Sequence, residues 1–525
     1  MRRAEGGRGA ARLVRRIPRF HSHRAPECTS QCAAGEPTAL ADQPTQPADQ
    51  RARPADQPAR PADQPEPPLQ ALEPVVQSSD LPVRPSELPV RPPELSARHS
   101  KLRRLFTTFA YLVAKQGATA VLGFAYLAVA THLFSARAVG LAAAASSTAF
   151  FLGAIGALGI PLLLVAELDL LPAAARRVTL STGMYISCLA VLILSLGTLA
   201  LSPFLGGSLR IIGADSTTAA LFVIGSVATM GTLTFDNAAV GLHRGSAQLW
   251  RGSLSSVLKL AVVGALVLVG IRTALGLLFA WAVTLVVSLA CYPLLRLQPT
   301  PAGEGNFSHR VAIARRYGVL SLKHHVLNLS INSVFYIVAV IAALLIPPQQ
   351  LAYFSTALLL ESTAMVIPYL LALSLFAEIS GDPSLLHHHV RRTLPLGLAL
   401  CAGIVVVAEV AAPLALRIFG PAYAMNGTTA LRLLVLVGFG YVIKDHYVAI
   451  RRAQGRLGHA VKAMAAGTCT EAAGAALGGI YWGMTGLCIG WAVAASCVGL
   501  ALLPAVFRVF HRDPSVEPVP SESSG

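Results

Sequence analysis

The chain has 525 residues, of which 54% are hydrophobic and 13% are charged, and its formal net charge is +16. A soluble domain carries charge on about a quarter of its residues, so most of this surface does not face water. The basic residues lie between apolar runs instead of forming one patch, which argues against nucleic acid as a partner. These features exclude an ordinary soluble enzyme and indicate a protein that crosses a membrane several times.

Residues 1–100 form a low-complexity segment rich in Pro, Ala and Arg, in which Pro-Ala-Asp-Gln recurs at Pro47, Pro54 and Pro61. With so few apolar side chains and so many prolines, this segment cannot bury a core. We therefore expect an extended, disordered cytoplasmic tail. It is either a tether for a cytoplasmic partner or a dispensable extension.

Apolar runs of about twenty residues or more follow, each long enough, at about 1.5 Å per residue, to cross about 30 Å of hydrocarbon. They predict an all-α polytopic membrane protein with about twelve transmembrane helices. The predicted spans are 105–133, 138–166, 178–202, 218–242, 250–271, 273–295, 319–346, 350–377, 393–418, 429–450, 459–482 and 484–507.

The charges between these spans predict the orientation of the chain. Basic residues should gather on the cytoplasmic side of the inner, or plasma, membrane. Loops on one side hold Arg137, Arg210, Arg272, Arg417 and Arg432. The loops that alternate with them hold many more basic residues, among them Arg176, Arg177, Arg244, Arg251, Arg296, Arg310, Arg315, Arg316, Arg391, Arg392, Arg451, Arg452 and Arg456. Both termini are therefore predicted to lie in the cytoplasm.

The longest hydrophilic segment inside the membrane part divides it into two halves. We predict an N-terminal six-helix bundle over 101–297, a cytoplasmic linker over 298–318, a C-terminal six-helix bundle over 319–510 and a short tail over 511–525. Two halves with equal numbers of spans are typical of transporters whose substrate path lies between two repeats. A central cavity between the bundles is the corresponding expectation.

Several short motifs resemble one transporter family. Leu416-Arg-Ile-Phe-Gly-Pro-Ala-Tyr423, followed by Ala430-Leu-Arg-Leu-Leu434, resembles the loop between spans nine and ten of the oligosaccharide flippases. These belong to the multidrug/oligosaccharidyl-lipid/polysaccharide exporter superfamily. Arg244-Gly245 after span four is similar to that family too, and Leu351-Ala-Tyr353 matches its Gly-x-Tyr step in part.

The resemblance implies two six-helix bundles around a central cavity that work by alternating access. It implies transport of a polyprenyl-(pyro)phosphate-linked oligosaccharide across the inner membrane for cell-envelope polysaccharide biosynthesis. If the N-terminal tail is a tether, glycan-assembly enzymes are the partners we expect for it. The sequence contains no Gly-x4-Gly-Lys-Ser/Thr loop, so the energy would come from an ion gradient, the membrane potential or product removal.

Polar residues inside spans are the candidate substrate ligands, because ionisable groups in a bilayer usually face a cavity or a partner. A cationic, hydrogen-bonding cavity would suit a pyrophosphate and sugar hydroxyls. For Lys115 the alternatives are snorkelling or a helix–helix pair, and for the basic residues of span seven an interfacial helix. In span one the candidates Tyr111, Lys115 and Thr119 share one helical face. In span seven His325, Asn328 and Asn332 share one face, with Lys323 and His324 beside them, and span five adds Lys259.

Two acidic residues fall near the middle of their spans, Glu361 and Glu471. Either could bind the proton or sodium ion that drives transport. Alternatively they pair with Lys115 or Lys259 as fixed counter-charges, which is the interpretation we favour. Arg251, which enters span five from the cytoplasmic side, is expected to snorkel to the interface.

Two other functions compete with a flippase. A small-molecule or drug exporter would use the same fold. A polyprenyl-dependent membrane glycosyltransferase or polymerase would need catalytic carboxylates in a sizeable external loop, whereas the external loops are short and Asp215 is their only acid. We therefore expect no enzyme activity and no cofactor. The triplet His387-His388-His389 is expected in a solvated loop and not at a metal site, because consecutive side chains of a helix cannot all face one metal.

Overall fold

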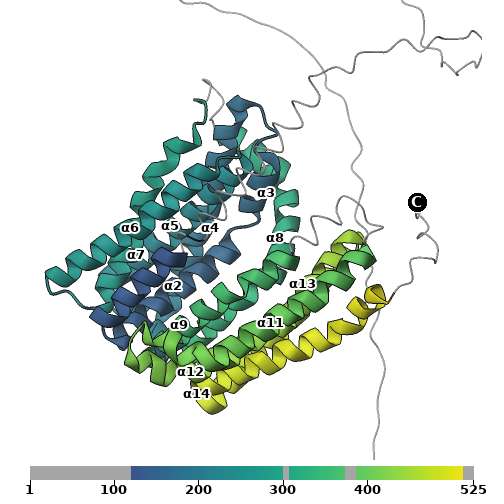
Figure 1. Cartoon of the computed structure of the whole chain (residues 1–525). Coiled ribbons are helices and arrows are strands. Elements are labelled where there is room, and N and C mark those ends of the chain that lie inside the picture. Colours follow the sequence, from purple (N-terminus) through teal and green to yellow (C-terminus); the bar gives the residue numbers. More distant parts are fainter. Residues whose placement is uncertain (1–116, 118–119, 300–306, 373–385, 512–525) are drawn as a thin grey trace, which may run out of the picture. The chain divides into compact units, whose positions relative to one another are not determined.

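The computed structural model describes residues 117, 120–299, 307–372 and 386–511, and in these ranges all regular secondary structure is helical (Figure 1). The predicted tail over 1–100 lies outside the described residues. Residues 105–116, 118 and 119 of the predicted first span also lie outside the described residues.

The N-terminal half begins with an apolar helix over Ala120–Leu133. The helices that follow pack against one another in the N-terminal half (Figure 1). They are α2 (Ala136–Gly156), α3 (Ile160–Glu167), α4 (Ala173–Leu201), α5 (Ser216–Gly241), α6 (Gly245–Leu268) and α7 (Ala274–Ser288), with the short 3-10 helices η1 (Ser202–Phe204), η2 (Gly207–Gly213) and η3 (Leu289–Leu295).

The C-terminal half contains α8 (Phe307–Leu345), α9 (Pro348–Ala364), α11 (Leu386–Arg417), α12 (Pro421–Val435), α13 (Val437–Ala453) and α14 (Leu457–Phe510). Among the described residues, nine helices are long and apolar enough to cross a membrane. The last of them, α14, contains two of the predicted spans, and Ala120–Leu133 and Ser333–Leu345 are shorter apolar helices. All twelve predicted spans thus have a helical counterpart, which confirms the polytopic all-α fold.

Helix α14 is a hairpin of two limbs. Trp482 (φ −133°) and Gly483 (φ 59°) leave the helical conformation and reverse the chain. Gly474 and Gly478 before the turn face Gly486 and Gly490 after it, so both limbs carry a Gly-x3-Gly motif at their contact. Such small residues let two helix backbones approach closely in a membrane, where side-chain burial gives little net attraction.

One predicted span is wrong in detail. The run over 138–166 was predicted as one helix, but α2 ends at Gly156 and α3 begins at Ile160. Leu158 (φ 50°) and Gly159 (φ 76°) between them are left-handed. A Cβ atom on Gly159 would lie 1.9 Å from the carbonyl oxygen of Ser321. The close passage of α8 therefore requires glycine here, and hydropathy alone does not reveal it.

Helix α8 contacts both halves of the chain. Its start at Phe307 lies inside the predicted linker, and Arg310 donates to the hydroxyls of Ser181 (3.0 Å) and Thr182 (3.3 Å) on α4. Further along, the carbonyl of Ser330 accepts a hydrogen bond from Thr468 of α14 (3.4 Å). Helix α8 thus packs on α4 of the N-terminal half near its start and on the C-terminal half at Ser330, and its end near Leu344 lies against Gly207 of η2 in the N-terminal half.

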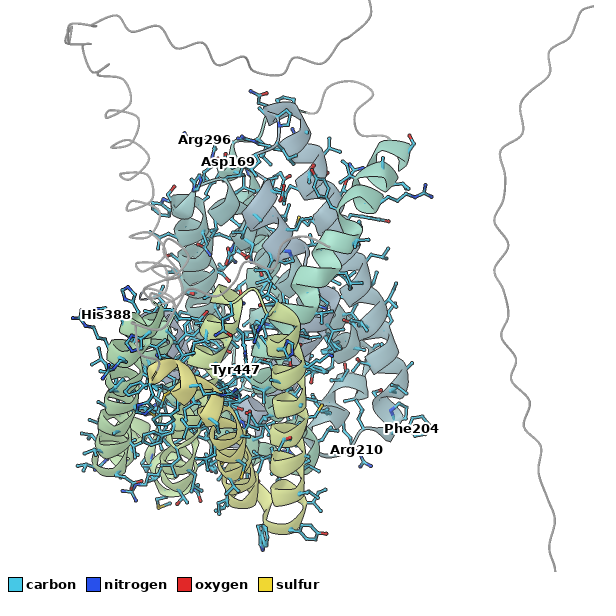
Figure 2. All side chains as sticks on the ribbon, turned by 90° about the vertical axis from the view of Figure 1, so that its right-hand side faces the viewer. Asp169, Phe204, Arg210, Arg296, His388 and Tyr447 are labelled. Atoms are coloured by element: carbon cyan, nitrogen blue, oxygen red, sulfur yellow. The ribbon has the colours of Figure 1, made fainter. Side chains whose placement is uncertain are left out.

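Figure 2 shows Asp169 and Arg296 at one end of the N-terminal helices and Phe204 and Arg210 at the other. We refer to these as the Arg296 end and the Arg210 end. The positive-inside rule predicts that the Arg296 end is cytoplasmic.

We expect Gly478→Ala to destabilise the protein, because its Cβ atom would lie 2.0 Å from the carbonyl oxygen of Gly486 and force the limbs of α14 apart. Overpacking of this kind costs about 1–3 kcal/mol. The matched control is Gly197→Ala in α4, where an added Cβ meets no atom within 4 Å. The midpoint of thermal unfolding in detergent should fall for the first variant only. Equal midpoints for both variants would contradict the close contact.

Candidate functional site

A buried polar cluster connects α8, α13 and both limbs of α14. The Glu471 carboxylate, which is fully buried, accepts hydrogen bonds from Lys444 Nζ (2.6 Å), Tyr441 Oη (3.2 Å) and Trp491 Nε1 (3.1 Å). Phe335 of α8 stacks on the ring of Tyr441 with ring centroids 4.9 Å apart, and it meets Trp491 edge-on at 5.7 Å. Both carboxylate oxygens are therefore engaged, and the ion pair is enclosed by aromatic rings.

This arrangement gives Glu471 a structural role. A buried ion pair is held in place by the cost of separating its charges, and its hydrogen bonds fix the helices that supply them. The expectation that Glu471 pairs with Lys115 or Lys259 was wrong, because Lys444 on α13 is its partner. Sequence reasoning missed Lys444, Tyr441 and Trp491. The run Lys444-Asp445-His446 inside the predicted span 429–450 was the available signal.

Glu361 on α9 is also fully buried, but neither of its carboxylate oxygens has a hydrogen-bond partner among the described residues. Its surroundings offer little polarity: Met365 lies one turn further along α9 and packs with Cys401 of α11 around Gly438. Tyr441 lies within electrostatic range of both Glu361 and Glu471. An ionised carboxylate in such a position costs several kcal/mol unless a proton or cation accompanies it.

In the N-terminal half, Arg251 and Asp236 form a bidentate ion pair. Arg251 donates from Nε to Oδ1 (2.6 Å) and from Nη2 to Oδ2 (2.8 Å), and from Nη1 to the hydroxyl of Ser288 (3.3 Å). These bonds join α5, α6 and α7. The expectation that Arg251 snorkels was wrong: its side chain is buried, because a carboxylate lies at the same depth on the neighbouring helix.

Lys259 lies two turns beyond Arg251 on α6. Its Nζ lies 5.1 Å from the centroid of the Tyr126 ring, a cation–π contact with the first apolar helix. Arg251 and Lys444 each have a carboxylate partner, whereas Lys259 has none among the described residues. The N-terminal half thus holds a cation inside a span that no described acid neutralises.

The other predicted ligands are placed only in part. Tyr111, Lys115 and Thr119 lie outside the described residues. Lys323, His324 and Asn332 belong to α8, but their side chains are not among those described. His325 is buried and Asn328 is exposed. The role of these residues in a cavity stays a prediction.

The triplet His387–His389 lies in the first turn of α11, so the loop expected there was wrong. In the described part of the chain, no group of three or more His, Cys, Asp or Glu side chains could hold a metal ion. Arg432 forms an ion pair with Glu409 (3.2 Å) across α11 and α12.

The sequence matches no protein-family model and no curated protein. The structure is similar to the lipid II flippase MurJ in an inward closed conformation, with a TM-score of 0.58 and 13% identity over 77% of this chain and 89% of that one. It is also similar to an inward-facing multidrug resistance transporter of the MATE family (0.49; 16% identity; 77% and 95%). A MATE transporter of Vibrio cholerae gives 0.49 and 16% identity over 79% and 98%.

The similarity to MurJ establishes the fold of this chain. At 13% identity it does not assign a substrate.

Glu471→Gln should destabilise the protein by about 3–5 kcal/mol, because Lys444 would be left as an uncompensated buried charge. The double variant Lys444→Met, Glu471→Leu should recover much of that loss, since it buries no charge. The free energies of unfolding of Lys444→Met, Glu471→Leu and the double variant form a cycle that measures the coupling. Additive losses would refute the structural role of the pair.

Proposed function

We propose that this chain is a transporter that flips a polyprenyl-(pyro)phosphate-linked oligosaccharide across the inner membrane by alternating access, for cell-envelope polysaccharide biosynthesis. Both termini lie in the cytoplasm in this proposal. The fold supports it, since MurJ is by name a lipid II flippase. The motif over Leu416–Tyr423 and Ala430–Leu434 supports the sugar branch of the superfamily.

The observation that carries the proposal is the uncompensated charge of Lys259. A cation inside a span costs a few kcal/mol, and a cation–π contact offsets only part of that cost. A substrate with a negatively charged pyrophosphate would supply the missing counter-charge. Tyr126, which contacts Lys259, follows Lys115 by eleven residues, or about three helical turns, so the periodicity predicts that both face the same way.

We further propose that Glu361 carries the coupling proton or cation, while Glu471 is fixed. The distinction rests on their partners. Glu471 has three donors in contact, whereas both oxygens of Glu361 lack a hydrogen-bond partner among the described residues. A carboxyl group that must change its charge state during a cycle cannot also be held by a permanent ion pair.

Lys259→Gln should slow transport at least about tenfold, because one charge-assisted contact to phosphate contributes about 1.5–3 kcal/mol. Lys259→Arg should keep most of the activity. The exposed Lys462 provides the control, Lys462→Gln. The measurement is the distribution of polyprenyl-linked glycan between the two leaflets in cells depleted of the native protein and supplied with each variant. Build-up on the cytoplasmic leaflet is expected for Lys259→Gln.

The same assay tests the substrate. Depletion of the protein without a variant should give the strongest cytoplasmic build-up of lipid-linked glycan. If the pool stayed normal in both leaflets, the sugar-flippase proposal would fail, and export of a small amphiphile or drug by the same fold would become the leading function.

Glu361→Gln should slow transport while leaving the amount of folded protein unchanged, because a neutral amide has the shape of the carboxyl group but cannot exchange a proton or bind a cation strongly. Activity should be measured in vesicles with and without an imposed ion gradient. The variant is expected to respond to the gradient less than the native protein does. Normal, gradient-dependent transport by Glu361→Gln would remove this residue from the coupling mechanism.

A further inference from the structure

A cluster of basic side chains lies at the Arg296 end, outside the residues assigned to transport. It is built from three chain segments: Arg176 from the first turn of α4, His243 and Arg244 from the turn between α5 and α6, and Arg296 from the end of η3. His243 (φ 54°) and Arg296 (φ 45°) are both left-handed. Non-glycine residues rarely adopt this conformation, so the local fold holds these turns in unusual geometry.

The charges of this cluster are only partly balanced. Asp169 is the acid that reaches it, and it is engaged by Arg176 (3.2 Å) and by His243 (3.7 Å). Arg176 also donates to the carbonyl oxygens of Asp169 (2.6 Å) and Leu171 (3.0 Å). These bonds hold its guanidinium against the turn that precedes α4. No ion pair with Arg244 or Arg296 occurs among the described residues.

Arg244 carries a positive charge that no acid among the described residues balances. Its Nη1 atom is buried and has no hydrogen-bond partner among the described residues. Burial lowers the pKa of Arg244, and the positive charges of Arg296 and Arg176 lower it further.

The backbone adds to the positive potential. Arg244 occupies the N-cap position of α6, and no side chain caps that end of the helix. The N-terminus of a helix of this length carries a partial positive charge and unsatisfied N–H groups, which favour an anion.

A buried apolar cluster adjoins these basic groups. Leu168, Leu242, Ala247 and Leu295 pack together in one buried cluster, and they come from the same segments that supply the basic side chains. The positive site therefore lies where the apolar interior of the N-terminal half meets its polar end. Lipid phosphates lie at the boundary between hydrocarbon and water, and basic pockets between helices on the cytoplasmic side are suited to them.

We propose that Arg244 and Arg296, together with the N-terminus of α6, form a binding site for the phosphate group of an anionic ligand. Arg176 and Asp169 position the turn beside it. The two sources of such a group are an anionic phospholipid of the same leaflet and a soluble phosphate compound. The site does not depend on the proposed transport function, since none of its residues belongs to the predicted cavity.

The test is a titration of the purified full chain in uncharged detergent, read as the midpoint of thermal unfolding. A ligand that binds only the folded state raises that midpoint with its concentration. The probes are phosphatidylglycerol, phosphatidylcholine and inorganic phosphate. The variants are Arg244→Gln and Arg296→Gln, with Arg210→Gln at the opposite end as the matched control (Figure 2).

Phosphatidylglycerol should raise the midpoint saturably, and phosphatidylcholine should not. Each of Arg244→Gln and Arg296→Gln should weaken the apparent affinity about tenfold or more, whereas Arg210→Gln should leave it unchanged. An additional saturable rise with inorganic phosphate would identify a soluble source, and its absence a lipid one.

The proposal is overturned if no anionic probe raises the midpoint, or if both variants respond as the native protein does. Arg296 is exposed, so its variant keeps the test valid even if Arg244→Gln fails to fold.

Discussion

The structure depends on one constraint: hydrocarbon supplies no hydrogen bonds, so each polar group inside a span needs a partner within the protein. Hydroxyl groups meet it locally. Thr148, Ser195 and Thr234 each donate to the carbonyl oxygen four residues earlier in their helix, at 2.7–2.9 Å. Charged groups meet it across helices, as Arg251 does with Asp236 and Lys444 with Glu471. Among the described residues Glu361 has no hydrogen-bond partner and Lys259 no carboxylate partner, and for this reason they are the functional candidates.

The same constraint explains why close backbone contacts fall where they do. Burial from lipid gives little net attraction between helices, so association relies on close van der Waals packing and on polar pairs. The α14 hairpin uses glycine on both limbs, and the Lys444–Glu471 pair then fixes it to α13. At the break between α2 and α3, the carbonyl of Leu158 accepts a hydrogen bond from Ser321 Oγ (2.6 Å), so the interrupted helix keeps its polar groups satisfied.

The sequence predicts a structural feature well when residues close together in the chain determine it. The length of an apolar run is local, so each predicted span has a helical counterpart among the described residues, although α8 begins at Phe307 and the predicted span only at residue 319. The break at Gly159 depends on α8, more than 150 residues away in the chain, and periodicity does not contain it. The depth of Glu361 and Lys259 could be counted along a helix. The partner of Glu471 could not, because Lys444 and Arg251 meet their acids only after the helices have packed.

Lys259 and Glu361, neither of which has a counter-charge among the described residues, have opposite charge and lie in opposite halves. Lys259 belongs to the N-terminal half, and a bound anion would neutralise its charge. Glu361 belongs to the C-terminal half, and a proton or a cation would neutralise its charge. In the proposed cycle a bound pyrophosphate and a coupling ion would each neutralise the group in its own half. Moving an unpaired charge through a medium of low dielectric constant costs several kcal/mol. A half of the transporter whose charge is neutralised avoids this cost when it reorients. Alternating access is then easiest when both sites are filled or when Glu361 is protonated, and this links substrate to driving ion without any direct contact between them.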